Sequence, residues 1–164
     1  MDKNRIGVGI LLVLLVAAGA GCADLGKSAA ESPAEGVLRI KIASIFVDDQ
    51  EKALEFYTKV LGFTTKDDIP VGEFRWLTIV SPGAPEGMEL LLEPNVLDAA
   101  RSFQQALFEE GIPATTFFVD DIQAEFDRLS ALGVVFTLKP TGAGSVTIAI
   151  FDDTCGNLIQ LTEH

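Results

Sequence analysis

Two glutamates in the segment MELLLEP, residues 88–94, have a spacing suited to acid–base or metal chemistry. Side chains alternate between the two faces of a strand, so Glu89, Leu91 and Glu93 are expected on one face. Two carboxylates there could hold Mg²⁺ or Ca²⁺, or act as a general acid and base if burial raises the pKa of one of them. The alternative, which we favour, is that both glutamates are solvated charges at the rim of a site.

Nucleophiles that could be activated are few in this chain. Cys155 is the only cysteine besides Cys22, and the single histidine, His164, is the C-terminal residue. Because no internal histidine can act as a base for the thiol, we expect Cys155 to be a buried or turn residue without a catalytic role. The sequence also has no Gly-rich phosphate loop, GxSxG elbow or CxxC pair. Catalytic residues stay unassigned, and no cofactor is predicted.

Arg75 and Trp76 stand next to each other in the strand-like segment FRWLTIVS, residues 74–81. Their side chains must point to opposite faces of the strand, so one of the two can reach a ligand. Tryptophan stacks on aromatic ligands and arginine clamps carboxylates. Each residue could instead belong to the core or to the surface.

A duplicated plan of elements positions these residues. The tetrapeptide FVDD at residues 46–49 recurs at 118–121, which is 72 residues later. The β-rich run 39–47 is followed by apolar residues at helical spacing over 50–61, and Gly62 can end that helix. Three short strands follow in FTTKDD, FRWLTIVS and MELLLEP. Residues 38–95 are therefore predicted to form a β-α-β-β-β module.

Residues 113–162 repeat this plan after a separate connecting helix at 96–110. The strand PATTFFV leads into a helix that stops at Gly133, and the strands VVFTLK, SVTIAIF and NLIQLTE follow. The acidic pairs 48–49 and 120–121 are expected to cap the two module helices. The pattern predicts an α+β domain over residues 38–164, built from two β-α-β-β-β modules.

The opening 22 residues read as an export signal rather than as part of the domain. Lys3 and Arg5 precede an apolar run over 6–20, which is short for crossing a membrane, and small residues lead to Cys22. The run VAAGAGC resembles a bacterial lipobox, which implies lipidation of Cys22 and a lipid anchor to a bacterial membrane in the cell envelope. An uncleaved anchor and an ordinary cleaved signal remain the alternatives. Residues 23–37 are small and polar, as in a flexible tether.

The charge balance excludes one class of partner. The chain of 164 residues has a net charge of −12 and a pI near 4.3. Nucleic-acid binding needs a basic surface that neutralises phosphates, so no nucleic-acid partner is predicted.

The duplicated plan, with LEFYTKVLGF in one half and IFDDTCGNLIQL in the other, resembles the vicinal oxygen chelate superfamily. Its members include glyoxalase I, extradiol dioxygenases and bleomycin-resistance proteins. The resemblance covers about residues 38–162 and implies two modules whose curved sheets form a paired cleft, usually with a divalent metal on its floor. It leaves open whether the modules pair within one chain or swap between two chains, as in a homodimer.

The family's metal-ligand positions fall on residues that are poor ligands in this chain. By the resemblance, these positions are Ile42, Leu91, Ala114 and Gln160. One amide oxygen does not hold a divalent cation against water, so no metal is predicted. This absence counts against glyoxalase and dioxygenase activity, both of which use the metal to polarise substrate oxygens.

The same resemblance supplies a set of residues that line the expected cleft. Counting by twos from Ile42 and from Ala114, and adding the residues discussed above, gives the ligand-binding candidates: Ile42, Ser44, Phe46, Arg75, Trp76, Glu89, Leu91, Glu93, Ala114, Thr116, Phe118 and Gln160. We expect an exported, membrane-tethered protein that binds a small, largely apolar or aromatic molecule without metal. The alternatives are a glyoxalase-like lyase or isomerase with a non-standard site, and a tethered interaction domain without a ligand.

Overall fold

The computed structural model describes residues 38–164, which form one compact unit, Leu38–His164. The predicted signal peptide, the predicted tether and Cys22, the predicted site of lipidation, lie outside the described residues. Within residues 38–164, no helix combines the length and the apolar character needed to cross a membrane. The description below therefore concerns the predicted domain alone.

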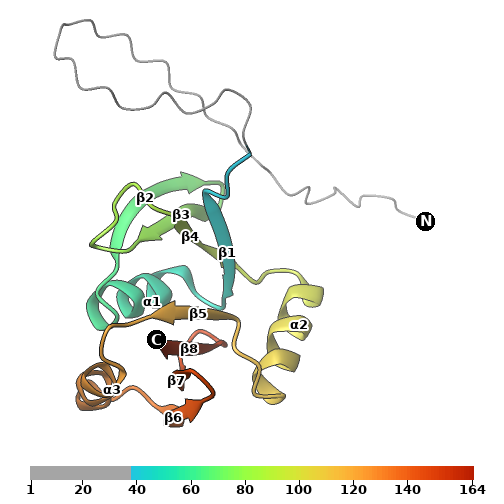
Figure 1. Cartoon of the computed structure of the whole chain (residues 1–164). Helices are drawn as coiled ribbons and strands as arrows, with labels where there is room; N and C mark the ends of the chain where they lie inside the picture. The colour runs from blue at the N-terminus through green and yellow to red at the C-terminus, as the bar shows by residue number, and fades with distance from the viewer. Residues whose placement is uncertain (1–37) are drawn as a thin grey trace, which may run out of the picture. The chain divides into compact units, whose positions relative to one another are not determined.

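The first module has the predicted order of elements (Figure 1). Its sheet has the strand order β1-β4-β3-β2, in which β1 runs parallel to β4 and the other neighbouring pairs are antiparallel. The bounds are β1 Ile42–Val47, α1 Gln50–Glu55, the π-helical turn η1 Phe56–Val60, β2 Thr64–Val71, β3 Phe74–Val80 and β4 Glu89–Pro94.

The second module repeats this topology with the strand order β5-β8-β7-β6, in which β5 runs parallel to β8. A connecting helix, α2, joins the modules. The bounds are α2 Asp98–Glu109, β5 Thr115–Phe118, α3 Ile122–Ala131, β6 Phe136–Ala143, β7 Val146–Asp152 and β8 Leu158–Glu163. The prediction of an α+β fold with two β-α-β-β-β modules is confirmed, and the two four-stranded sheets do not close into a barrel.

Acidic side chains begin both module helices, as predicted. The Asp49 carboxylate accepts hydrogen bonds from the backbone N–H groups of Glu51 and Lys52, at 2.8 and 3.0 Å. The Asp121 carboxylate accepts one from the N–H of Ala124 at 2.9 Å. These bonds satisfy donors that have no partner inside the first turn of a helix.

The first helix differs from its prediction at its C-terminal end. A single helix over residues 50–61 was expected, but α1 ends at Glu55 and continues as the wider turn η1. There the N–H of Leu61 donates to the carbonyl of Phe56 at 3.1 Å, a span of five residues instead of four. Apolar spacing does not distinguish these two ladders, because both keep Phe56 and Tyr57 on the buried side.

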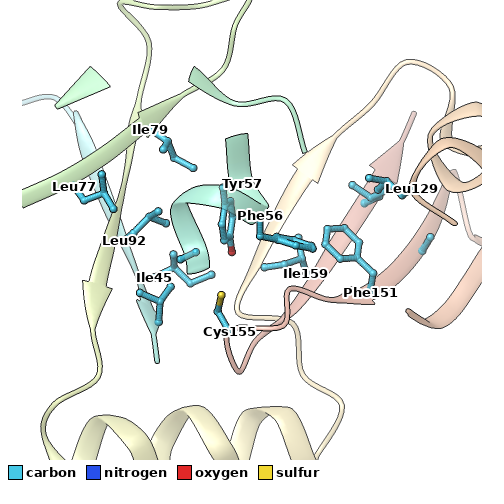
Figure 2. Packing of buried hydrophobic residues seen from close by; sticks show 14 of the residues in the cluster. Ile45, Phe56, Tyr57, Leu77, Ile79, Leu92, Leu129, Phe151, Cys155 and Ile159 are labelled. Carbon is cyan, nitrogen blue, oxygen red and sulfur yellow. The ribbon is translucent and has the colours of Figure 1, made fainter. Parts of the chain in front are cut away.

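Both modules contribute to one hydrophobic core. Helix α1 lies between the first sheet and β5 (Figure 1), and the rings of Tyr57 and Phe117 meet edge to face with centroids 6.5 Å apart. Figure 2 shows the buried cluster reaching from Ile45 and Leu77 in the first sheet to Phe151 and Ile159 in the second. The helix-side faces of the two sheets are thus the interior of the domain.

Candidate functional site

The face of the first sheet that points away from α1, called here the open face, carries most of the candidate residues of this module. In the parallel pair of β1 and β4, Ser44 lies beside Leu91 and Phe46 beside Glu93. Neighbouring residues on paired strands point to the same side, so these four side chains share the open face. Ile42 and Glu89 are paired in the same way one step earlier.

Trp76 belongs to this open face. Strand β3 pairs with β4 through Thr78 opposite Leu91, and Trp76, two residues before Thr78, points to the same face beyond the last pair of this ladder. There the Gln50 side chain lies between the two strands and donates to the carbonyls of Arg75 and Leu92, at 2.8 Å each. On its other side Trp76 pairs with Ile69 of β2. Trp76, Phe46 and Glu93 are half-buried, whereas Ile69 is 49% exposed. An aromatic, apolar and acidic row therefore crosses the four strands.

Arg75 lies on the opposite face, so its prediction as a residue of the cleft is wrong. Its guanidinium forms ion pairs with Glu51 of α1 at 2.9 Å and with Asp68 at 3.2 Å. The side chain of Gln50 adds a bridge, because its Oε1 accepts from the N–H of Arg75 at 3.0 Å and its Nε2 donates to the carbonyl of Leu92 at 2.8 Å. Alternation along the strand could not tell which of Arg75 and Trp76 lies on the open face. The register of β3 against β2 and β4 places Trp76 there.

The two glutamates of β4 differ in their partners. Glu89 forms an ion pair with Lys66 at 3.2 Å, and its side chain is 13% exposed. This contact raises the pKa of Lys66 through the hydrogen bond from its ammonium group to Glu89. No ion pair found among residues 38–164 involves Glu93, although its side chain is half-buried. Of the two glutamates of β4, only Glu93 therefore lacks an ion-pair partner among residues 38–164.

The corresponding face of the second sheet, also called an open face below, presents the repeat-related positions. Thr116 of β5 lies beside Gln160 of β8, and Phe118 lies beside Thr162. The amide of Gln160 donates to the hydroxyl oxygen of Thr162 at 3.0 Å. Phe118 is 66% exposed, and its ring stacks on that of His164 with centroids 5.3 Å apart. The predicted residue Ala114 begins the same row, where its N–H donates to the carbonyl of Leu158.

The residues at the family's metal positions do not fit a divalent cation. Ile42, Leu91 and Ala114 have no ligand atoms in their side chains, and Gln160 offers a single neutral amide oxygen. Over residues 38–164, no three side chains of the His, Cys, Asp or Glu type come together in a metal-binding group. No step of a reaction is therefore assigned to a metal here.

A buried carboxylate in the loop between β7 and β8 joins the modules. Asp153, which is fully buried, accepts a hydrogen bond from the Tyr57 hydroxyl at 2.9 Å and one from the side-chain amide of Asn157 at 2.7 Å. Backbone N–H groups of Cys155 and Asn157 donate to its other oxygen at 2.8 and 2.9 Å. Burial raises the pKa of Asp153, and these hydrogen bonds oppose the rise.

Gln104 of α2 is a second polar residue that the sequence did not single out. It is the only buried residue of that helix. Its Nε2 donates to the carbonyls of Phe46 and Cys155, at 2.8 and 3.0 Å, and its Oε1 accepts from Asn95 at 2.6 Å. The connecting helix is therefore attached to both modules through one amide.

Cys155 is buried and unpaired, as the sequence predicted. Burial raises the pKa of its thiol to about 12. Because the thiolate is the nucleophilic form, this cysteine is unreactive at neutral pH.

Two pockets of the domain lie away from the open faces. One, of about 440 Å³, lies between α2 and the loop at residues 152–156, and its wall includes Arg101, Gln104 and Asp152. The other, of about 460 Å³, runs along α1 and η1 between Glu51 and Thr65. Neither wall contains one of the twelve candidate residues.

Comparison with known proteins agrees with the two-module topology. The model of the Glyoxalase/Bleomycin resistance protein/Dioxygenase superfamily matches residues 39–161. YurT of Bacillus subtilis, a protein described as uncharacterized, is 58% identical over 126 residues, which are 77% of this chain and 99% of YurT.

Two solved structures are similar in fold and in sequence. UcmS2 is 30% identical with a TM-score of 0.69, and the match covers 78% of this chain and 99% of UcmS2. TnmS3 from Streptomyces sp. CB03234, described as an antibiotic binding protein, is 27% identical with a TM-score of 0.61 over 78% of this chain and 97% of its own. The chain belongs to the Glyoxalase/Bleomycin resistance protein/Dioxygenase superfamily.

Proposed function

We propose that this protein binds a small, largely apolar or aromatic molecule on its open faces and needs no metal to do so. The observation that carries the proposal is the row formed by Trp76 and Phe46 beside Leu91, which offers apolar contact area that no helix covers. Ser44 and Gln160 supply polar groups, as small-molecule sites commonly do. The likeness to TnmS3, described as an antibiotic binding protein, supports the same class of activity.

Trp76 makes the proposal directly testable, because it is the only tryptophan of the chain. We expect acridone, an uncharged planar aromatic compound, to quench the fluorescence of Trp76 in a saturable titration of the full chain. Leu91→Lys should weaken binding by about tenfold or more, because an unpaired ammonium group would be desolvated against the ligand. Leu132→Lys is the matched control, since Leu132 is 56% exposed at the end of α3. Unsaturable quenching, or equal effects of both substitutions, would contradict the proposal.

A lyase or isomerase is less well supported by the geometry. Its candidate acid–base groups were Glu89, Glu93 and Gln160. Glu89 is paired with Lys66. Glu93 lies four residue steps further along β4, a length of about 13 Å at 3.3 Å per residue. Two carboxylates at that distance do not share a proton, so the pair lacks the coupling that would set one as acid and the other as base.

We also propose that a second copy of the chain completes the site. Ile42, Ile69 and Phe118 lie on the open faces and are 39, 49 and 66% exposed. Side chains of this kind are usually covered in a functional assembly. Light scattering of the full chain during gel filtration should give the mass of a dimer, and Phe118→Lys should shift it toward that of a monomer. A monomer at all concentrations would contradict this arrangement.

The location proposed for this binding protein is the bacterial cell envelope, with a lipid on Cys22 as its anchor. The support is the layout of residues 1–22, in which an apolar run and small residues precede the cysteine. The small, polar segment 23–37 would then hold the domain away from the membrane.

A further inference from the structure

Glu93 occupies a position that a counter-ion from inside the described domain does not reach. Lys66, on the same sheet, is engaged by Glu89 at 3.2 Å and by Glu86 at 3.8 Å. Arg75 lies on the other face and is engaged by Glu51 and Asp68. Over residues 38–164, none of the ion pairs includes Glu93. Glu93 is nevertheless half-buried as a residue, so its side chain has lost part of its hydration.

Aromatic rings stand on both sides of this carboxylate. Phe46 of β1 pairs directly with Glu93, and Trp76 lies on the same face of β3, the other neighbouring strand, beyond the last pair of the β3–β4 ladder. All three side chains are half-buried on the open face. The π-face of an aromatic ring attracts a cation, most strongly in the case of tryptophan, and a carboxylate pairs with the same cation. One positively charged nitrogen could therefore use all three residues.

The wider charge pattern acts in the same direction. The chain has a net charge of −12, and Asp67 adds a second carboxylate on the open face, in the row of Thr78 and Leu91. A protein of this charge concentrates cations near its surface and repels anions.

We infer that the molecule bound on the open face carries a positively charged nitrogen, which Glu93 holds between Trp76 and Phe46. The inference rests on the proposed small-molecule binding and narrows its ligand to aromatic or apolar amines, guanidines and protonated heterocycles. Leu91 and Ile69 then contact the uncharged body of the molecule. The repeat-related position in the second sheet is Thr162, so the charge requirement belongs to the first module alone.

Two probes that share a ring system test the charge requirement. Proflavine is a planar aromatic cation at neutral pH. Acridone is an uncharged compound with the same tricyclic skeleton. Both are titrated into the full chain, with the fluorescence of Trp76 as the readout. We expect proflavine to bind about tenfold more tightly than acridone, because one charged contact at a partly buried site has about that effect.

Matched variants locate the effect at Glu93. Glu93→Gln should remove the preference for proflavine over acridone. Glu89→Gln removes the same charge from the same strand. Because the Glu89 carboxylate already forms an ion pair with Lys66, the preference for proflavine over acridone should persist in this variant. If acridone binds but proflavine binds no better, or if both variants reduce proflavine binding equally, the inference is wrong and the proposed function stands. If neither probe binds, both are wrong.

Discussion

At the scale of single residues, the contact between Tyr57 and Asp153 is the most informative one in the domain. It joins a residue of η1 to one in the loop before β8, at 2.9 Å, and both side chains are fully buried. Desolvation raises the pKa of Tyr57 well above its usual range, and burial also raises the pKa of Asp153. Tyr57 and Cys155 therefore stay protonated near neutral pH, and Asp153 is the group of this cluster that titrates.

This arrangement gives stability a defined pH dependence. Because the pKa of Asp153 is higher in the folded than in the unfolded chain, its contribution is fully present below the unfolded value and is lost as pH rises through the folded value. Relative to Asp153→Asn, the wild-type protein should thus lose free energy of unfolding from about pH 4 upward and then level off. Urea unfolding of both proteins across this range measures the difference. A difference that grows with pH would mean that the hydrogen bonds outweigh burial.

At the scale of elements, α2 is held mainly by hydrogen bonds rather than by apolar packing. Its only buried residue is Gln104, whereas Phe103 is 57% exposed. The Gln104 amide reaches the end of β1 through the carbonyl of Phe46 and the loop before β8 through the carbonyl of Cys155. The attachment of α2 to the two modules therefore depends largely on one polar side chain.

Replacing Gln104 should be costly for that reason. Gln104→Leu keeps the volume but leaves Asn95 and the carbonyl of Cys155 with fewer partners, so we expect a loss of about 2–3 kcal/mol in the free energy of unfolding. Gln105→Leu is the control, because Gln105 is exposed and bonds only to Glu109 at 2.7 Å. The control should change stability by less than about 0.5 kcal/mol. Equal losses in chemical denaturation would show that Gln104 has no special role.

The same elements show what the sequence could and could not predict. The duplicated FVDD segments and the caps Asp49 and Asp121 depend on neighbours within a few residues, so pattern alone located both module helices. The turn η1 and the role of Gln104 depend on partners about 50 residues away or on a subtle change of helical ladder, which no local pattern records.

The candidate site shows the same limit. Alternation along β4 correctly grouped Glu89, Leu91 and Glu93, because a period of two is a local property. The choice between Arg75 and Trp76 needed the register of β3 against its neighbours, which is set by tertiary packing. The distinction between a paired Glu89 and an uncompensated Glu93 required the position of Lys66 on β2.

At the scale of the whole molecule, the two modules use one face of each sheet for a shared core, and the proposed ligand site lies on the other faces. The core runs from Ile45 to Leu161 through both modules (Figure 2), so neither module is complete alone. The proposed ligand, the second copy and the membrane anchor all concern surfaces or segments outside this core. Each can therefore be altered without unfolding the domain.

The proposed anchor gives a prediction for the intact chain. If Cys22 is lipidated, the mature protein begins at that residue and carries acyl groups, and it sediments with the membrane fraction. Mass spectrometry of the N-terminal peptide checks both points, and Cys22→Ser should abolish acylation and release the protein from membranes. An unprocessed N-terminus at Met1 in the soluble fraction of the wild-type cells would contradict the anchor.

The most direct test of the central claim, binding without a metal, is acridone affinity measured before and after metal removal. The full chain is treated with a strong chelator, and Trp76 fluorescence and thermal unfolding are followed in parallel. Since Ile42, Leu91 and Ala114 offer no ligand atoms, the dissociation constant and the melting temperature should both stay unchanged, and adding Zn²⁺, Mg²⁺ or Mn²⁺ should alter neither. Loss of acridone binding together with a clear fall in melting temperature on chelation, both reversed by one of these metals, would contradict the account.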